Sequence, residues 1–176
     1  MDAKPLSIAR LFKNPGQYVI PVFQRHYVWD KENQWEALWE DILSQARAKL
    51  DGSPKPHYCG AIVLDQKKQQ GVEELARFDV IDGQQRLTTF QIVMSAMRDV
   101  GAAHGHTDLL KKLVPLLVNQ NFADLPNPES DQFKLRPTRY DQNQFKDILT
   151  EIVRGSVKSM LQRGLEQHSR VVFQRL

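Results

Sequence analysis

Hydrophobic and polar positions follow two different periods along this chain, and the change of period is clearest between residues 78 and 97. A short apolar run, Phe78 to Ile81, has the length of a buried strand. Beyond Gly83, apolar residues recur with the spacing of one helix face, at Leu87, Phe90, Met94 and Met97. The pattern predicts a strand that enters a long helix through a single glycine.

The same criteria predict further elements on both sides of this strand and helix. Strands are expected at residues 18–23, 57–64 and 132–136, with Pro21 arguing for an edge position or a strand end. Residues 65–74 are expected to form a hairpin connection. Ser7, Asp30, Thr107 and Asp141 are expected to cap helices, and Pro115 is expected to kink or interrupt the third of these.

The order of these elements predicts the fold class. Strands and helices alternate in the first half, whereas the second half is mostly helical, which indicates an α+β fold and not a doubly wound sheet. We expect a core of residues 1–100 and a helical extension of the same module at residues 101–176. The pattern of residues 156–176 is helical and ends without a stop signal, which is typical of a truncated chain.

Composition narrows the class of protein. The chain has 176 residues, of which 41% are hydrophobic and 26% are charged, as in ordinary globular domains. No apolar run approaches the roughly 20 residues of a membrane span, and the N-terminus has no signal-peptide pattern, so a cytoplasmic protein with no membrane partner is expected. The single cysteine, Cys59, excludes an internal disulfide and a multi-cysteine zinc site.

The net charge of +3 is unevenly distributed. From Lys134 to Leu176 there are nine Lys/Arg residues and four Asp/Glu residues, whereas the rest of the chain has 15 and 17. A basic segment of this kind can face nucleic acid, or it can be the solvated surface of a helix.

The turn at Gly83 carries candidate chemistry. A strand that enters a helix through glycine directs several free backbone N–H groups to one point, where the helix dipole also favours an anion. Arg86 adds a planar set of donors suited to phosphate. These features indicate a phosphate site.

A simpler interpretation stays open for the same residues. Asp82 and Gln85 have the spacing of a capping box, in which case the turn only starts a helix and Arg86 is a solvated arginine. A second polar cluster, Gln24 and Arg25, lies just past a predicted strand end. It could complete a site with a distant loop, or Arg25 could form a surface salt bridge.

Four segments of the chain resemble segments of a known family and occur in the same order. They are Phe23-Gln24-Arg25-His26-Tyr27-Val28-Trp29, Tyr58-Cys59-Gly60-Ala61-Ile62-Val63, Val80-Ile81-Asp82-Gly83-Gln84-Gln85-Arg86-Leu87-Thr88-Thr89, and Phe133-Lys134-Leu135-Arg136-Pro137-Thr138. Together they resemble the DGQQR-motif domain, a ParB/sulfiredoxin-like domain at the N-terminus of GmrSD-type modification-dependent restriction proteins and of the related SspE phage-defence proteins. The resemblance covers nearly the whole chain.

The resemblance implies a ParB/sulfiredoxin-like mixed sheet with packed helices, followed by the helical extension. It also implies an NTPase that binds and hydrolyses GTP, ATP or another nucleoside triphosphate with Mg²⁺. In the family, this activity regulates the recognition of modified DNA and its cleavage by an HNH nuclease domain. No HNH constellation follows Val100, so we expect the nuclease to be a C-terminal or separate domain and do not expect this chain alone to cut DNA.

Matched residue by residue, the resemblance implies specific roles. Catalytic roles fall on Asp82, Gln84, Gln85 and Arg86, and Asp82 is also the implied metal ligand. Nucleotide contacts fall on Gln24, Arg25, Gly83 and Thr88. The alternatives to an NTPase are a non-catalytic DNA-binding module and a structural interaction module.

Overall fold

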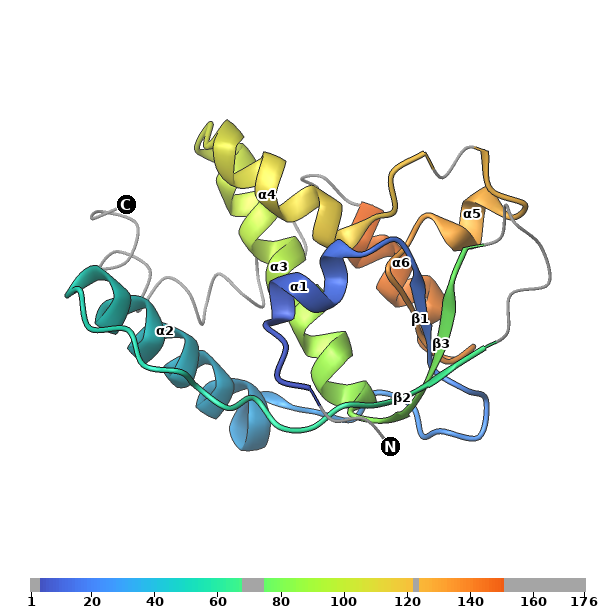
Figure 1. The fold of residues 1–176 in the computed structure, drawn as a ribbon, viewed down its shortest axis with the longest axis horizontal. Coiled ribbons are helices and arrows are strands. Elements are labelled where there is room, and N and C mark those ends of the chain that lie inside the picture. Colours follow the sequence, from blue (N-terminus) through green and yellow to red (C-terminus); the bar gives the residue numbers. More distant parts are fainter. Residues whose placement is uncertain (1–3, 68–74, 122–123, 151–176) are drawn as a thin grey trace. The chain divides into compact units, whose positions relative to one another are not determined.

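The computed structural model describes residues 4–67, 75–121 and 124–150 (Figure 1). Within these residues the chain divides into two compact units, one of residues 4–26, 61–67, 75–121 and 124–150 and the other of residues 27–60. The predicted helix at residues 156–176 lies outside the described residues, as does most of the loop predicted at residues 65–74.

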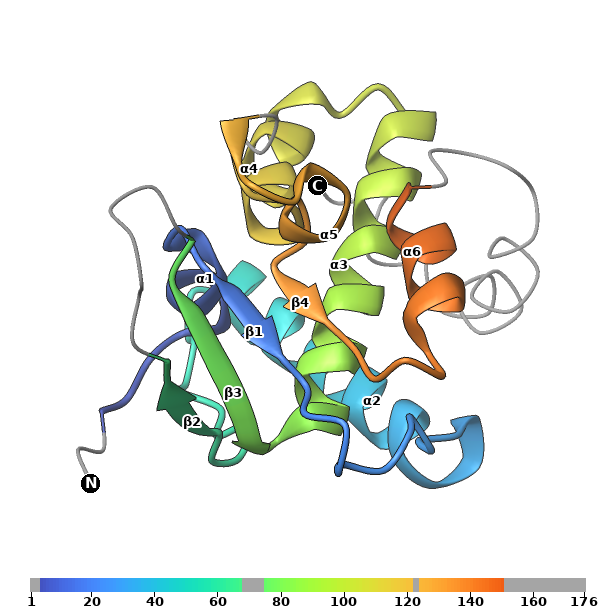
Figure 2. The same ribbon diagram turned by 90° about the vertical axis from the view of Figure 1, so that its right-hand side faces the viewer.

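The first unit is organised around a four-stranded mixed sheet with the order β2-β3-β1-β4 (Figure 2). The strands are β1 (Gln17–Val19), β2 (Val63–Gln66), β3 (Arg77–Asp82) and β4 (Leu135–Arg136). β1 is parallel to both of its neighbours, whereas β2 and β3 form an antiparallel pair. With the helices that pack around it, this sheet confirms the predicted α+β class. The ParB/sulfiredoxin-like topology stays a prediction.

In the described residues, the same unit contains the helices α1 (Ile8–Lys13), α3 (Gln84–Ala103), α4 (Thr107–Leu117), α5 (Pro128–Asp131) and α6 (Gln142–Thr150). The long helix α3 packs against α4, α6 and β4. Its predicted apolar face supplies core residues at Leu87, Phe90 and Met94, and the buried side chains of the chain also include Phe12, Leu117, Leu135 and Phe145. The predicted cap of α1 is confirmed, because the Ser7 hydroxyl accepts from the Arg10 N–H at 3.2 Å.

The second unit contains one π-helical turn, η1 (Lys31–Trp35), and α2 (Glu36–Leu50). Asp30 caps this segment as predicted, since its carboxylate accepts from the Asn33 N–H at 2.9 Å. Hydrogen bonds from Asn33 lower the pKa of Asp30. Apolar residues recur at helical spacing along this segment, and of these Leu43 is buried, whereas Trp35 and Trp39 are only half-buried.

Two strand predictions are wrong in position. The strand expected at residues 18–23 ends at Val19 and lies inside the sheet, because Pro21 follows the strand and removes no hydrogen bond from it. The strand expected at residues 57–64 starts only at Val63. Gly60 has φ 93°, a left-handed conformation that breaks an extended strand before that point.

The predicted cap of α4 is wrong. Thr107 is the first residue of the helix and not its cap, which is His106. Pro115 lies inside the helix and does not interrupt it, because α4 continues to Leu117, and the alternative of a kink at Pro115 stays a prediction. A proline two residues before the end of a helix removes only one helical hydrogen bond, so the final turn survives.

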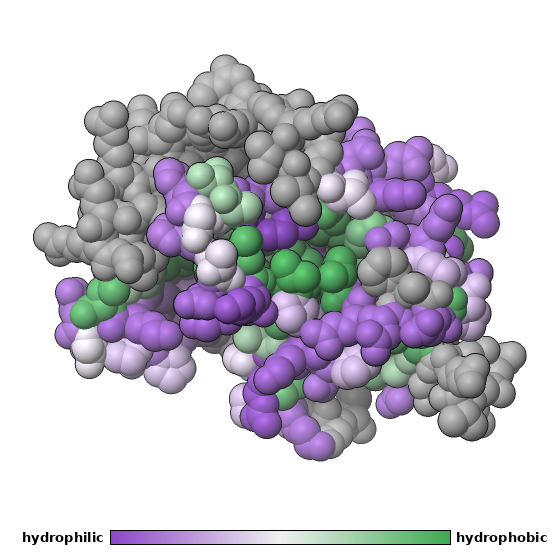
Figure 3. Space-filling model, turned by 90° about the horizontal axis from the view of Figure 1, so that it is seen from above, coloured by the Kyte–Doolittle hydropathy of each residue, from purple (hydrophilic) through white to green (hydrophobic). Residues whose placement is uncertain are grey.

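The predicted boundary at residue 100 stays a prediction. In the described residues α3 runs across it, and β4 from the predicted extension pairs with β1 from the predicted core. None of the helices in the described part of the chain combines the length and apolarity that crossing a membrane requires. On the face drawn in Figure 3, the visible hydrophobic residues gather in the middle and hydrophilic residues border them.

Candidate functional site

The parallel pairing of β1 and β3 brings the two predicted polar motifs together. Parallel strands end at the same edge of a sheet, so the residues that follow β1 and those that follow β3 emerge side by side. Gln24 follows β1 and Gln84 follows β3, and their side-chain amides are hydrogen-bonded at 3.2 Å. This carboxyl edge of the strands is where open α/β sheets bind ligands.

Gly83 is the N-cap of α3 and has φ 95° and ψ 11°. This left-handed conformation is accessible to glycine at little cost. Helical hydrogen bonding begins with the Leu87 N–H, which donates to the Gly83 carbonyl at 3.0 Å. The backbone N–H groups that precede Leu87 in the first turn therefore have no helical acceptor and point out of the helix start. The cap itself adds no side-chain hydrogen bond.

The capping-box interpretation is wrong. Asp82 is the last residue of β3 and not the N-cap, and its carboxylate does not cap the helix. The Gln85 side chain also points elsewhere, because its amide donates to the His26 carbonyl at 3.0 Å. The αL conformation of Gly83 turns the chain before an Asp82–Gln85 box can close.

A charged pair flanks the turn. The Arg86 guanidinium lies 3.5 Å from the Asp82 carboxylate, with 24% of the arginine side chain and 65% of the aspartate side chain exposed. An exposed ion pair at this distance contributes little to stability. Arg86 can therefore exchange this partner for a phosphate oxygen at small cost, while Asp82 remains open to water.

Gln84 and Gln85 are buried, which sequence reasoning did not foresee. Only 8% of Gln84 and 7% of Gln85 is exposed. Gln84 donates to the Gln24 side chain, and Gln24 in turn donates to the Ile81 carbonyl at 2.9 Å. These bonds tie the segment after β1 to the start of α3. The predicted catalytic roles of the two glutamines stay predictions.

The remaining predicted residues differ in their access to the turn. Thr88 is 4% exposed and its hydroxyl donates to the Gln84 carbonyl at 2.9 Å, so it lies along the helix axis and away from water. Arg25 is exposed. Its neighbour Phe23 is 75% exposed, an unusual fraction for an aromatic ring. A nucleotide contact from Thr88 or Arg25 stays a prediction.

A polar stripe runs along the buried side of α3 and was missed from the sequence. Its members are Gln84, Thr88, Gln91, Ser95 and Arg98, spaced alternately by four and three residues, and each is at most 8% exposed. Gln91 donates to the Leu116 carbonyl of α4, and Ser95 and Arg98 donate to carbonyls near the end of α6. The heptad-like spacing was visible in the sequence and was the available signal.

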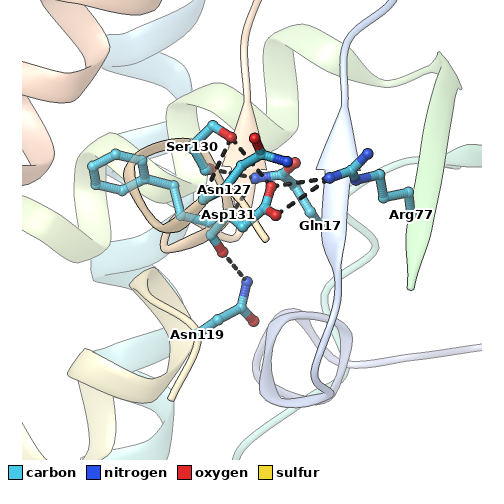
Figure 4. Close-up of polar contacts among 7 residues, drawn as sticks. Gln17, Arg77, Asn119, Asn127, Ser130 and Asp131 are labelled. Carbon is cyan, nitrogen blue, oxygen red and sulfur yellow. Dashed lines mark hydrogen bonds and ion pairs between the residues drawn. The ribbon is translucent and has the colours of Figure 1, made fainter. Parts of the chain in front are cut away.

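A second buried polar network lies at the amino ends of the same strands (Figure 4). Arg77 of β3 pairs with the fully buried carboxylate of Asp131 at 3.1 Å. Gln17 of β1 donates to the Ser130 and Phe133 carbonyls, and Asn119 donates to the Asp131 carbonyl. These contacts fasten the segment around α5 to the sheet, at the end opposite to Gly83.

Lys134 corrects the prediction of a basic face that begins at this residue. It is 3% exposed, and its ammonium group donates to the Asn14 carbonyl at 2.7 Å. Burial lowers the pKa of Lys134 to about 8. Arg136, Arg139 and Lys146 are exposed, and the basic residues after Thr150 lie outside the described part of the chain.

Cys59 does not have the environment of a nucleophile. Burial raises the pKa of its thiol, and the negative charge of Asp41 raises it further. A reactive cysteine needs the opposite shift. Cys59 is therefore better described as a half-buried packing residue than as a nucleophile.

The fold and the turn together define an α+β domain with a polar helix start assembled from two separated motifs. A family model described as "GmrSD restriction endonuclease, N-terminal domain" matches residues 8–165, and the chain belongs to this family. The match supports a role in a restriction or phage-defence system. No curated protein matches the chain.

Proposed function

We propose that this domain binds and hydrolyses a nucleoside triphosphate at the start of α3. The observation that carries the proposal is the left-handed Gly83 at the head of a 20-residue helix, with Arg86 one turn further on. Such a helix start offers backbone N–H donors and the positive end of a helix dipole to an anion. Arg86 adds a charge that only a loose, partly exposed ion pair engages.

The residues at the turn also fit a magnesium–phosphate group. Asp82 presents an exposed carboxylate at the end of β3. The described residues hold no group of three His, Cys, Asp or Glu side chains that could bind a metal ion. Because Mg²⁺ in nucleotide sites is commonly held by one or two carboxylates together with phosphate oxygens and water, Asp82 is a sufficient protein ligand. Bound Mg²⁺ would neutralise charge on the phosphate oxygens.

In this proposal each residue at the turn has a distinct task. The first-turn amides and Arg86 hold the terminal phosphates and stabilise charge that develops during transfer. Arg25, which is exposed on the neighbouring segment, reaches the same group from the β1 side. In the proposal Gln84 and Gln85 keep their predicted catalytic roles, and their hydrogen bonds to the segment after β1 would fix their positions at the turn.

The family membership suggests what such an activity regulates. A nucleotide-hydrolysing N-terminal domain of a restriction protein would control DNA recognition or cleavage by a nuclease domain outside this chain. The DNA, the modification that it carries and an HNH-type nuclease are therefore the proposed partners. No nuclease activity is proposed for this chain.

A thermal-shift screen with GTP, ATP, CTP and UTP, each with Mg²⁺, tests the proposal. A ligand at about 100 times its dissociation constant stabilises the folded state by roughly 2.7 kcal/mol, which raises the melting temperature by several degrees. Inorganic sulfate serves as a control for a general anion effect. If no triphosphate at millimolar concentration moves the melting temperature of folded protein, the binding proposal is wrong.

A further inference from the structure

Two peptide connections join residues 27–60 to the first unit, one after His26 and one before Ala61. On the first unit's side, both connections contact the turn at the start of α3. The Gln85 amide donates to the His26 carbonyl at 3.0 Å, on the last residue before the first connection. A short polar element of the first unit thus contacts the residues that flank both sides of an inserted segment of 34 residues.

The second connection is held by close packing. A Cβ atom at Gly83 would lie 3.3 Å from the Ala61 carbonyl oxygen, 3.3 Å from Ile62 Cα and 3.0 Å from Ile62 Cγ1. The backbone of residues 61–62 therefore lies directly against the glycine. Any movement of the turn toward this backbone must displace it, because close-packed groups have no free volume to absorb the shift.

The first connection is held by a chain of three amide hydrogen bonds. Gln84 donates to Gln24, Gln24 donates to the Ile81 carbonyl, and Gln85 donates to His26. All three bonds join the segment after β1 to residues 81–85. A ligand that pulls on the first-turn amides therefore also acts on the chain that leads to residue 27.

We propose that residues 83–85 form a clamp that couples ligand binding at the turn to the placement of residues 27–60. The proposal rests on the proposed function for its trigger, a phosphate at the first-turn amides. Gln85 and Gly83 hold one connection each, so one local shift acts on both together. Residues 27–60 are attached to the first unit at these two points. When both points move together, the segment reorients as a body, as in hinged domain closure.

The clamp can be tested without nucleotide. Gln85→Leu removes the bond to His26, and Gln24→Ala removes the bonds to Gln84 and Ile81. Gln91→Leu is the matched control, because Gln91 is buried on the same helix and donates to the Leu116 carbonyl, far from both connections. We expect amide hydrogen exchange at residues 24–28 to accelerate roughly five-fold in the first two variants, the factor for one lost hydrogen bond of about 1 kcal/mol. Equal acceleration in all three variants, or none in the first two, overturns the clamp.

A distance measurement tests the coupling. Spin labels are placed at Glu40→Cys and Lys112→Cys, two exposed positions in different units, in a chain that also carries Cys59→Ser. We expect a saturating triphosphate with Mg²⁺ to shift the distance distribution in this parent and in the Gln91→Leu background. In the Gln85→Leu background, at a concentration shown by calorimetry to saturate that variant, the shift is expected to be lost.

The outcomes separate the two proposals. Calorimetric binding without any shift in the labelled parent overturns the coupling and leaves the proposed function in place. A shift that persists in the Gln85→Leu background overturns the role of Gln85 in the clamp. Absence of triphosphate binding to the parent refutes the proposed function and the trigger, while the exchange experiment still decides whether the turn holds the first connection.

Discussion

At Gly83, both the backbone conformation and the packing of neighbouring atoms favour glycine over any residue with a side chain. Its φ of 95° disfavours any side chain, and the atoms of Ile62 leave no room for a Cβ. Gly105 has a similar φ of 72° with nothing within 4 Å of the Cβ position. Comparing these two glycines therefore separates the cost of a left-handed backbone from the cost of placing a Cβ atom against close neighbours.

Substitution of Gly83 by alanine is expected to cost more stability than the same change at Gly105. Gly105→Ala adds only the left-handed strain, about 1 kcal/mol, whereas Gly83→Ala adds a contact that the backbone of residues 61–62 must relieve, for a total of roughly 2–3 kcal/mol. Urea unfolding of the two variants measures the difference. Equal losses would mean that the packing around Gly83 is not tight.

Lys134 predicts a dependence of stability on pH. Its pKa is about 8 in the folded protein, below the ordinary value of 10.5, so between these values the unfolded chain binds more protons. The contribution of Lys134 to the free energy of unfolding is fully present above pH 10.5 and is lost as the pH falls through 8. The whole change in this free energy is about 3 kcal/mol. The parent should therefore gain stability relative to Lys134→Met as the pH rises from 8 to 10.

Unfolding free energies of both proteins at several pH values provide the measurement. The other titrating groups, including Tyr18 with its pKa raised to about 12 by burial, are common to both proteins and cancel in the difference. A difference that does not change with pH would contradict the lowered pKa.

At the scale of elements, periodicity predicted the structures whose packing is local. Of the predicted helix face, Leu87, Phe90 and Met94 are buried as expected and Met97 is half-buried, because a 3.6-residue period needs no knowledge of the partner. The caps at Ser7 and Asp30 were also predictable, since the acceptor and the donor lie three residues apart. The meeting of the 24–25 and 82–86 motifs required the parallel pairing of β1 with β3.

The wrong predictions concern positions whose structure depends on residues that are far away in the sequence. Pro21 was expected to mark an edge position or a strand end, and only the pairing of β1 with β4, more than a hundred residues away, shows that the strand is interior and that its end is the correct alternative. Gln85 was assigned to a capping box or, with Gln84, to a catalytic role, and the burial of both was not predicted, because a buried amide is costly without a partner. Their partners at Gln24 and His26 could not be identified before the sheet order was known.

The network at the amino ends of β1 and β3 predicts an asymmetric response to mutation. Arg77→Met leaves the buried Asp131 carboxylate without its cation, and because the Arg77 side chain is 41% exposed we expect a moderate loss of about 2 kcal/mol. The double variant Arg77→Met/Asp131→Asn removes the uncompensated charge and should recover part of this loss. Urea unfolding of the single and double variants tests the expectation, and a double variant less stable than Arg77→Met would refute it.

At the scale of the whole molecule, the exposed basic residues predict salt-dependent DNA contact. Arg136, Arg139 and Lys146 are exposed in the described part of the predicted basic segment, whereas Lys134 is buried. Each phosphate contact that is lost should reduce the slope of log affinity against log salt by about 1. We therefore expect a lower slope for Arg139→Ala and an unchanged slope for Lys134→Met.

These slopes are measured by fluorescence anisotropy of a labelled DNA duplex at salt concentrations from about 50 to about 200 mM, a range that includes the physiological value. An affinity that is independent of salt would rule out a basic DNA face. An unchanged slope for Arg139→Ala, with a steep slope in the parent, would place the phosphate contacts on other residues.

The proposed action of the Gly83 turn on a triphosphate depends most directly on Arg86. The measurement is the rate of triphosphate hydrolysis by the parent and by Arg86→Ala, together with the melting temperature of each protein. The control is Arg10→Ala, which replaces an exposed arginine of α1. Because the Arg86–Asp82 pair is loose, the melting temperature should change little. Loss of a donor to developing charge should lower the rate by about 10²- to 10³-fold, whereas Arg10→Ala should keep the parent's rate. A folded Arg86→Ala protein that hydrolyses triphosphate as fast as the parent would contradict the proposed function and leave the turn as a helix start only.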